Sequence, residues 1–187
     1  MSELAPEYIA AALALGQVCE EYRKTVGSPA YLVGGAAVAI HTQGTFHSAD
    51  FDLIVGAEAK FVEILLRHGF VKETGQGKFL NGYYHPAHPQ FSWELVSGPL
   101  FDGRSDKQRA LQIRFNEHSV LVTPAIEDLI ADRLGQYAVA APSDESRKEQ
   151  AKMLFQVTEN IDMDYLKKRV LEEGGDMSLL DTWTRAD

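Results

Sequence analysis

The chain has 187 residues, of which 45% are hydrophobic and 24% charged, a composition that excludes a disordered or collagen-like protein. Its 18 Lys and Arg residues and 27 Asp and Glu residues give a net charge of −9, which disfavours an extended DNA groove and an anionic membrane surface as partners. Cys19 is the single cysteine, no apolar run is long enough to span a membrane, and the first residues lack a basic signal region. These features predict a cytoplasmic protein.

The first half of the chain predicts alternating helices and strands. Apolar residues recur at helical spacing before Gly27, and short apolar runs are followed by glycines or acidic residues. In chain order we expect a helix over residues 6–26, a strand over 30–33, a helix over 36–41, a strand over 51–55 and a helix over 57–68.

Residues 70–122 are rich in strand patterns. A Gly-rich turn at residues 74–77 predicts a hairpin, and the other apolar runs are separated by polar loops. The expected strands cover residues 70–73, 78–84, 91–96, 111–115 and 119–122. Residues 1–122 are therefore expected to form an α/β domain with a mixed sheet flanked by helices.

The last third of the chain has a helical composition. Thr123 and Pro124 are typical of a helix start, the hydroxyl capping the helix and the proline occupying its first turn. We expect helices to about residue 140, over 143–157 and over 163–172, which together form a C-terminal helical unit over residues 123–173. Residues 174–187 are expected to be a weakly held tail.

Three acidic residues stand on apolar strands. Asp50 and Asp52 are two positions apart, so in a strand they point to the same side, while Phe51 points to the core. Glu94 lies between Trp93 and Leu95 on a later strand, and if that strand neighbours the first, the three carboxylates meet at one edge. Hard oxygen ligands of this kind suit Mg²⁺ better than zinc.

Gly34 and Gly35 join a strand to a helix. Free backbone N–H groups at the helix start, with no Cβ in the way, predict a phosphate-binding turn. A phosphate site combined with metal-binding carboxylates is typical of phosphoryl or nucleotidyl transfer.

A Gly-Gly pair opening a helix, a D-x-D at the start of an apolar strand and a later acid with apolar neighbours resemble the minimal nucleotidyltransferases of the DNA polymerase beta superfamily. The resemblance is strongest to the bacterial branch that includes the nucleotidyltransferase-like toxins of toxin–antitoxin systems and the aminoglycoside nucleotidyltransferases. It implies that Gly34 and Gly35 hold the triphosphate and that Asp50 and Asp52 ligate Mg²⁺. Glu94 would complete the metal site and help to deprotonate an acceptor hydroxyl, which attacks the α-phosphate and expels pyrophosphate.

The resemblance also implies a nucleoside triphosphate substrate and an acceptor that is a small molecule, a tRNA end or a protein side chain. His47 and Ser48, directly before the first acid, are assigned to the same nucleotide site, His47 standing where related sequences often have a basic residue. The chain departs from the family pattern at Arg133, where many relatives have lysine, and at Gln150, where an acidic residue is common. A homo-oligomer or a partner protein is compatible with this interpretation.

Several residues keep a second interpretation. Glu94 could pair with Arg114 on a neighbouring strand, and Asp102 is a rival third carboxylate. The Arg104–Arg114 stretch could form a local basic pocket. The loop histidines His85 and His88 are interpreted as loop residues rather than metal ligands. Two further possibilities are that Tyr83 or Tyr84 stacks on a base and that His41 lies on the surface.

Two other functions compete with the enzymatic one. A dinucleotide-binding oxidoreductase fits poorly, because the segment Val33–Val38 lacks G-x-G-x-x-G and the acids begin their strand instead of ending it. A catalytically inactive nucleotidyltransferase-like partner, for example in a toxin–antitoxin system, keeps the same fold without the chemistry.

Overall fold

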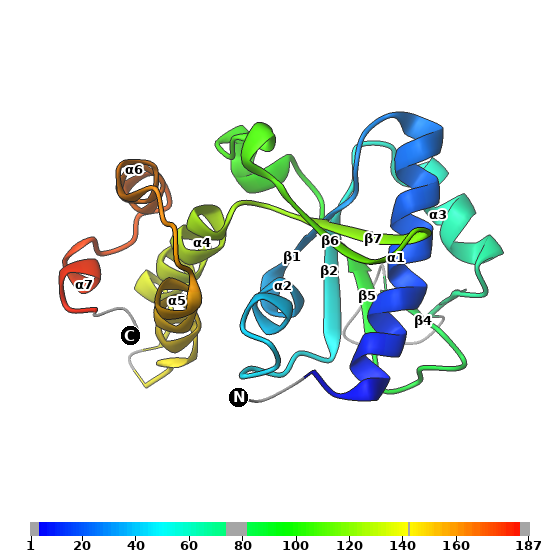
Figure 1. Ribbon diagram of the computed structural model, residues 1–187, viewed down its shortest axis with the longest axis horizontal. Coiled ribbons are helices and arrows are strands. Elements are labelled where there is room, and N and C mark those ends of the chain that lie inside the picture. Colours follow the sequence, from blue (N-terminus) through cyan, green and yellow to red (C-terminus); the bar gives the residue numbers. More distant parts are fainter. Residues whose placement is uncertain (1–3, 74–81, 142, 184–187) are drawn as a thin grey trace. The chain divides into compact units, whose positions relative to one another are not determined.

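The computed structural model describes residues 4–73, 82–141 and 143–183, in which helices and strands alternate as predicted (Figure 1). The helices are α1 (Pro6–Val26), α2 (Gly34–His41), α3 (Glu58–Arg67), α4 (Ile126–Ala138), α5 (Ser146–Val157), α6 (Met163–Glu172) and α7 (Ser178–Asp181), with 3-10 turns η1 (Leu100–Gly103) and η2 (Lys107–Arg109). The strands are β1 (Tyr31–Val33), β2 (Asp50–Ile54), β3 (Val71–Lys72), β4 (Gly82–Tyr84), β5 (Ser92–Leu95), β6 (Leu111–Asn116) and β7 (Ser119–Thr123). The predicted mixed α/β class is therefore confirmed.

The strands form one mixed sheet in the order β3-β4-β5-β2-β1-β7-β6. β2 pairs with β5 in parallel, as β1 does with β7, and the other neighbours are antiparallel. Parallel neighbours need a long crossover, and the chain that contains α3, β3 and β4 supplies it between β2 and β5. The two strands that carry the predicted acidic residues are thus direct neighbours.

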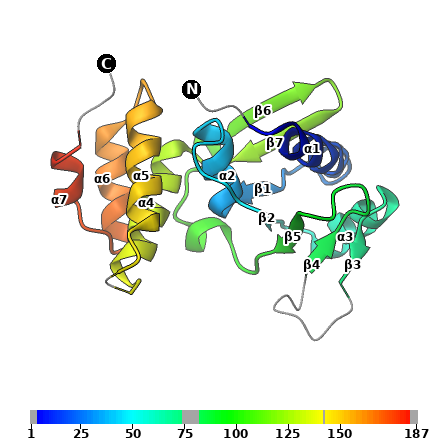
Figure 2. The ribbon, with the colours of Figure 1, turned by 90° about the horizontal axis from the view of Figure 1, so that it is seen from below.

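Helices α1 and α3 cover one face of this sheet (Figures 1 and 2). The apolar side of β2 points to them: the ring of Phe51 stacks with Tyr8 of α1 at 5.1 Å between centroids and with Trp93 of β5 at 5.5 Å. Because side chains alternate along a strand, Asp50 and Asp52 point to the other face. Burial of the aromatic side of β2 therefore fixes the direction of its acidic side.

Helix α1 follows the sequence signals closely. Pro6 occupies the first turn, where its missing N–H costs nothing, and Gly27 ends the helix with φ +79°, its N–H donating to the carbonyl of Arg23. The predicted range of residues 6–26 is confirmed.

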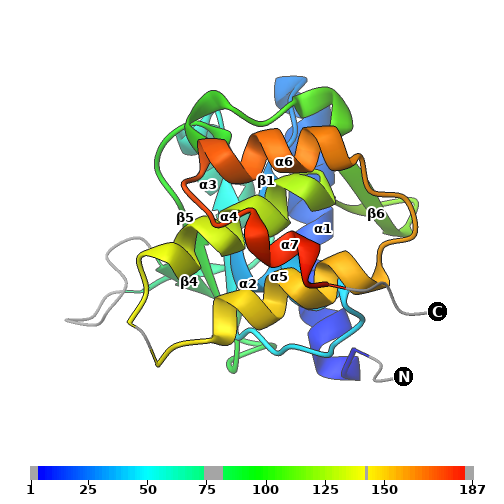
Figure 3. The ribbon, with the colours of Figure 1, turned by 90° about the vertical axis from the view of Figure 1, so that its left-hand side faces the viewer.

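A second compact unit contains residues 101–109 and the chain from Pro124 onward. Within it α4 lies between α5 and α6 (Figure 3). A Cβ added at Gly135 of α4 would lie 2.6 Å from the carbonyl oxygen of Glu173, so the glycine permits a close approach between α4 and the end of α6. The centre of this unit holds a fully buried ion pair between Asp128 and Arg169.

The boundaries of this unit differ from the expected ones. Residues 101–109 join the helices because Ser105 Oγ donates to Asp128 at 2.7 Å and Arg109 pairs with Asp162 at 2.9 Å. The expected tail is ordered at least to Trp183, whose ring contacts Phe155 at 5.6 Å between centroids, and it includes the buried Leu180. Polar contacts explain the first difference, and apolar contacts of Trp183 and Leu180 explain the second.

The expected start of the first C-terminal helix is wrong by two residues, since the cap is Ala125 and not Thr123. Thr123 is the last residue of β7, and its Oγ1 lies 2.8 Å from Nε2 of His41 instead of capping the helix, which begins at Ile126. β3 and β4 pair in antiparallel fashion as expected for the hairpin, and its turn lies outside the described residues.

Within the described chain, no helix has the length and apolar character needed to cross a membrane.

Candidate functional site

Asp52 occupies the middle of the sheet. Its neighbour on β1 is Val33, the residue directly before the glycine pair, and its neighbour on β5 is Glu94. Residues in register on paired strands point to the same face, so Asp52 and Glu94 lie side by side there, and both are half-buried. The strand pairing that the sequence left open therefore brings these two acids together.

Asp50 lies two residues earlier on the same face and is also half-buried. Its neighbour on β5 is Ser92, whose Oγ donates a hydrogen bond to Asp50 Oδ1 at 2.5 Å. Ser48 Oγ donates to the backbone carbonyl of Asp50 at 3.0 Å. Two hydroxyl groups thus hold the side chain and the main chain of this residue.

The glycine turn lies against these residues. Gly34 has φ +70°, a conformation that strongly favours glycine, and an added Cβ would lie 2.1 Å from Asp52 Oδ2. An added Cβ at Gly35 would lie 2.9 Å from Ser48 Oγ. Gly34 is buried, with the Asp52 carboxylate against it, whereas Gly35 at the start of α2 keeps partial exposure.

The donor chemistry of this face fits a hard divalent cation, because three carboxylate-bearing residues share one face and two adjacent strands. Across residues 4–73, 82–141 and 143–183, however, no three His, Cys, Asp or Glu side chains are arranged to hold a metal ion. The backbone therefore gathers the three acids, but their side chains in this conformation do not converge on one point.

The alternatives for these acids are not supported. Arg114 is on β6, and β1, β2 and β7 lie between it and β5, so it is not on a strand next to Glu94. Asp102 belongs to the second unit, is exposed, and lies 3.8 Å from Arg104. His47, which the sequence assigned to the nucleotide site, is exposed, and Ser48 is the next residue in the chain.

The histidines His85, His88 and His41 contact neighbouring protein groups. His85 Nδ1 accepts a hydrogen bond from the Ala87 N–H at 3.2 Å and its ring contacts that of His88, as expected of loop residues. His41 is half-buried: its Nε2 lies 2.8 Å from Thr123 Oγ1, and burial lowers its pKa to about 4. Of the two tyrosines proposed to stack on a base, Tyr83 is buried and Tyr84 is exposed.

Two basic residues of the expected pocket, Arg104 and Arg109, are paired with acids. Arg109 pairs with Asp162 and lies over the Tyr165 ring at 4.3 Å, and Arg104 donates to the carbonyl of Glu172. These contacts, all within the second unit, oppose an open cationic pocket there.

At the two positions that depart from the family pattern, Arg133 is buried and pairs with Asp132, and its Nη1 lies 3.5 Å from Gln150 Oε1. The two departures are therefore in contact with one another. Both residues belong to the second unit.

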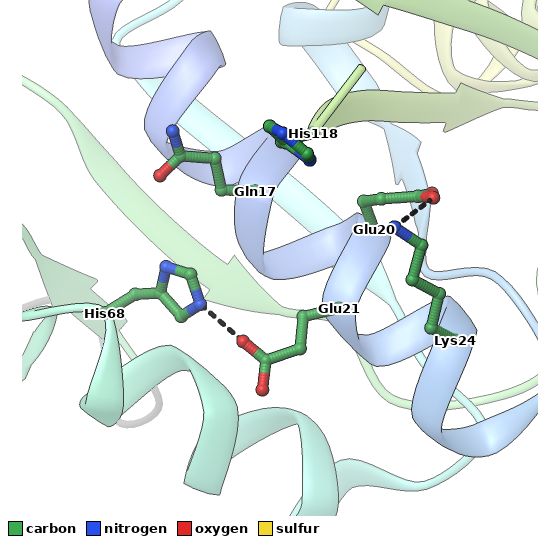
Figure 4. Close-up of a pocket in the computed structure, with 6 residues that line it drawn as sticks. All are labelled: Gln17, Glu20, Glu21, Lys24, His68 and His118. Atoms are coloured by element: carbon green, nitrogen blue, oxygen red, sulfur yellow. Dashed lines mark hydrogen bonds and ion pairs between the residues drawn. The ribbon is translucent and has the colours of Figure 1, made fainter. Parts of the chain in front are cut away.

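A separate hollow of about 270 Å³ lies on α1, on the side of the sheet opposite the acids. Figure 4 shows its lining: Gln17, Glu20, Glu21, Lys24, His68 and His118. The acids there are already matched, since Glu20 pairs with Arg23 and Lys24, which lowers its pKa to about 2, and Glu21 pairs with Arg67 and His68. This hollow therefore lacks the unmatched acids expected of a metal site.

The site residue that the sequence did not indicate is Ser92. Its signal was present, because Ser92 precedes Glu94 by two positions as Asp50 precedes Asp52, but serine is too common near strand ends for this spacing to single it out.

No protein-family model matches the chain, and no curated protein sequence gives a match. Solved structures do. The solution structure of the antibiotic-resistance factor ANT(2'')-Ia aligns with a TM-score of 0.57 and 10% identity over 93% of this chain and 96% of that one. An antigenic nucleotidyltransferase-like protein from Paracoccidioides brasiliensis aligns with a TM-score of 0.57 and 14% identity over 94% of both chains.

A crystal structure of ANT(2'')-Ia in complex with adenylyl-2''-tobramycin aligns with a TM-score of 0.55 and 10% identity over 96% of this chain and all of that one (100%). At such low identity these likenesses concern the fold. The chain therefore has a nucleotidyltransferase-like fold.

Proposed function

We propose that the protein is a nucleotidyltransferase that moves a nucleoside monophosphate from a nucleoside triphosphate to a hydroxyl group, with Mg²⁺ as the cofactor. The observation that carries the proposal is the register of Asp52 with Glu94 next to the Gly34 turn, within a nucleotidyltransferase-like fold. Asp50, Asp52 and Glu94 are the residues that would hold the ion. When bound, the ion would neutralise charge on the phosphates and on the developing transition state.

The chain's own groups supply the remaining steps. The start of α2 at Gly35 offers backbone N–H groups to the phosphates, and His47 and Ser48 lie on the adjacent loop. Glu94 takes the proton of the acceptor hydroxyl, whose oxygen then forms a bond to the α-phosphorus. The bond from that phosphorus to the bridging oxygen breaks, and pyrophosphate leaves with the electron pair.

Acceptors of positive charge are the first to test. The net charge of −9 favours the approach of cationic molecules, and one structural neighbour was solved with an adenylylated aminoglycoside, adenylyl-2''-tobramycin. A tRNA end and a protein hydroxyl remain the other acceptor classes.

The test is incubation of the protein with Mg²⁺, each α-labelled nucleoside triphosphate and, separately, an aminoglycoside, tRNA or a cell extract. We expect label in one acceptor and an equal amount of pyrophosphate, and neither product with the Asp52→Asn variant. Metal-dependent triphosphate binding by calorimetry without any transfer would favour the inactive-partner alternative. Absence of both binding and transfer would overturn the proposal.

A further inference from the structure

Ser92 forms a close contact within the group of acids. Its Oγ donates a hydrogen bond to Asp50 Oδ1 at 2.5 Å. Both residues are half-buried, so the bond is partly protected from water. Oδ1 is therefore occupied, and no described residue donates a hydrogen bond to Oδ2 of Asp50.

The strand register explains why this contact is specific. Asp50 is paired with Ser92, and Asp52 is paired with Glu94. The two strands therefore place two cross-strand pairs of polar side chains on one face of the sheet. An acid at position 92 would add a fourth negative charge, and an apolar residue would leave the Asp50 carboxylate free to rotate about its χ angles. A neutral hydroxyl donor avoids both effects.

The main chain of Asp50 is held at the same time. Ser48 Oγ donates to its carbonyl oxygen, and Ser48 lies directly against Gly35 at the start of α2. Asp50 is thus fixed from the loop before β2 and from β5. For Glu94, in contrast, no hydrogen bond or ion pair to another described residue is found.

We propose that Ser92 is a positioning residue for the divalent ion: by binding Oδ1 of Asp50 it fixes that carboxylate and presents Oδ2 as the metal-binding oxygen. This inference rests on the proposed function, since it concerns the same metal site. Hydrogen-bond partners of metal ligands commonly change metal affinity by about 10- to 100-fold when they are removed. For a neutral donor on one of three ligands we expect the lower end, about tenfold.

The experiment is direct Mn²⁺ titration, followed by the electron paramagnetic resonance signal of the free ion, on the full chain and four variants. Ser92→Ala should bind Mn²⁺ about tenfold more weakly than the wild type, and Ser92→Thr, which keeps the hydroxyl and suits a strand, should restore the affinity. Ser97→Ala is the matched control, because Ser97 is exposed beyond the end of β5 and makes no hydrogen bond to a described residue. Asp52→Asn reports on the metal site itself.

In transfer assays Ser92→Ala should lower kcat and raise the Mg²⁺ concentration needed for half-maximal rate, with the nucleotide KM at saturating Mg²⁺ unchanged. A purely structural role would lower the melting temperature without changing Mn²⁺ affinity. If Ser92→Ala binds Mn²⁺ as the wild type does while Asp52→Asn does not, the inference on Ser92 is overturned and the proposed function stands. If the wild type binds no Mn²⁺, alone or with a nucleoside triphosphate, both are overturned. Should Ser92→Ala not fold, failure of Ser92→Thr to bind the ion as the wild type does also overturns the inference.

Discussion

Aspartates are held in two different ways in the two units of the chain. Asp128 of α4 is fully buried and receives hydrogen bonds from Arg169 Nε at 2.6 Å, Ser105 Oγ at 2.7 Å and the Tyr165 hydroxyl at 3.1 Å. Asp50 of β2 is half-buried and receives its side-chain hydrogen bond from the neutral Ser92.

The difference separates a structural carboxylate from one suited to a ligand. A buried charge is tolerated when a partner of opposite charge and further hydrogen bonds replace water, and Arg169 supplies that charge to Asp128. On the acidic face, the side of the sheet that carries Asp50, Asp52 and Glu94, Ser92 orients Asp50 without cancelling its charge. The second arrangement leaves negative charge for a cation.

The largest expected effect is on the acidic face. Asp52→Asn keeps the shape of the side chain but removes the charge, so we expect at least about a hundredfold loss of nucleotide transfer, the cost typical of removing a group that stabilises charge in a transition state. The melting temperature should stay the same or rise, because one of two adjacent carboxylates is neutralised. Pyrophosphate release and thermal melting are the measurements.

Asp102→Asn is the control for this variant, since Asp102 is an exposed acid of the second unit. It should retain full transfer. Wild-type activity in Asp52→Asn would remove the acidic face from the mechanism.

Removing one member of the buried Asp128–Arg169 ion pair should lower stability, whereas neutralising Asp52 should not. Arg169→Leu leaves Asp128 charged and buried without its cation, which typically costs about 3–5 kcal/mol in the free energy of unfolding. Lys168→Ala is the control, because Lys168 precedes Arg169 on α6 and is exposed. It should change the free energy of unfolding by less than about 0.5 kcal/mol. Urea denaturation measures both, and equal values for the two variants would contradict a structural role for this ion pair.

The same distinction shows what the sequence alone can predict. The alternation of Phe51 with Asp50 and Asp52 was sufficient to place the two acids on one face, because the period of a strand is fixed by backbone geometry. The start and end of α1 were predictable for a similar reason, since Pro6 and Gly27 act through local backbone conformation.

What the sequence did not predict depends on contacts between distant residues. The 101–109 segment joins the helical unit because Ser105 meets Asp128, 23 positions later, and Thr123 contacts His41 across 82 positions instead of starting a helix. Ser92 has an ordinary strand-start sequence, and its importance emerges when β5 is placed beside β2. The tertiary partner, rather than local propensity, determines the role in each case.

The glycine turn offers a smaller and purely steric test of the acidic face. Gly34 and Gly27 have similar positive φ values of +70° and +79°, but an added Cβ at Gly34 meets Asp52 Oδ2, whereas none of the surrounding atoms lies within 4 Å of one at Gly27. Gly27→Ala should cost about 1–2 kcal/mol for the left-handed backbone alone. Gly34→Ala should lower the free energy of unfolding by about 1–2 kcal/mol more than Gly27→Ala, an amount typical of overpacking. It should also reduce nucleotide transfer, because the Asp52 carboxylate must move.

Urea denaturation and pyrophosphate release on both glycine variants separate the two contributions. Equal stability losses with unchanged transfer in Gly34→Ala would show that the Asp52 carboxylate does not depend on this turn.

The smallest effect concerns His41, which extends the comparison to a group kept neutral by burial. Burial lowers its pKa to about 4, while an unfolded histidine has a pKa of about 6.5, so the unfolded state binds more protons between these values. The stability that neutral His41 contributes is therefore fully present above about pH 6.5 and is lost as the pH falls from 6.5 through 4. His41→Gln, which cannot titrate, should lose less stability than the wild type when urea denaturation is compared at pH 7 and at about pH 4.5. Parallel pH curves for the two proteins would mean that His41 is hydrated in the folded state, because a histidine in contact with water would keep its ordinary pKa and contribute no slope.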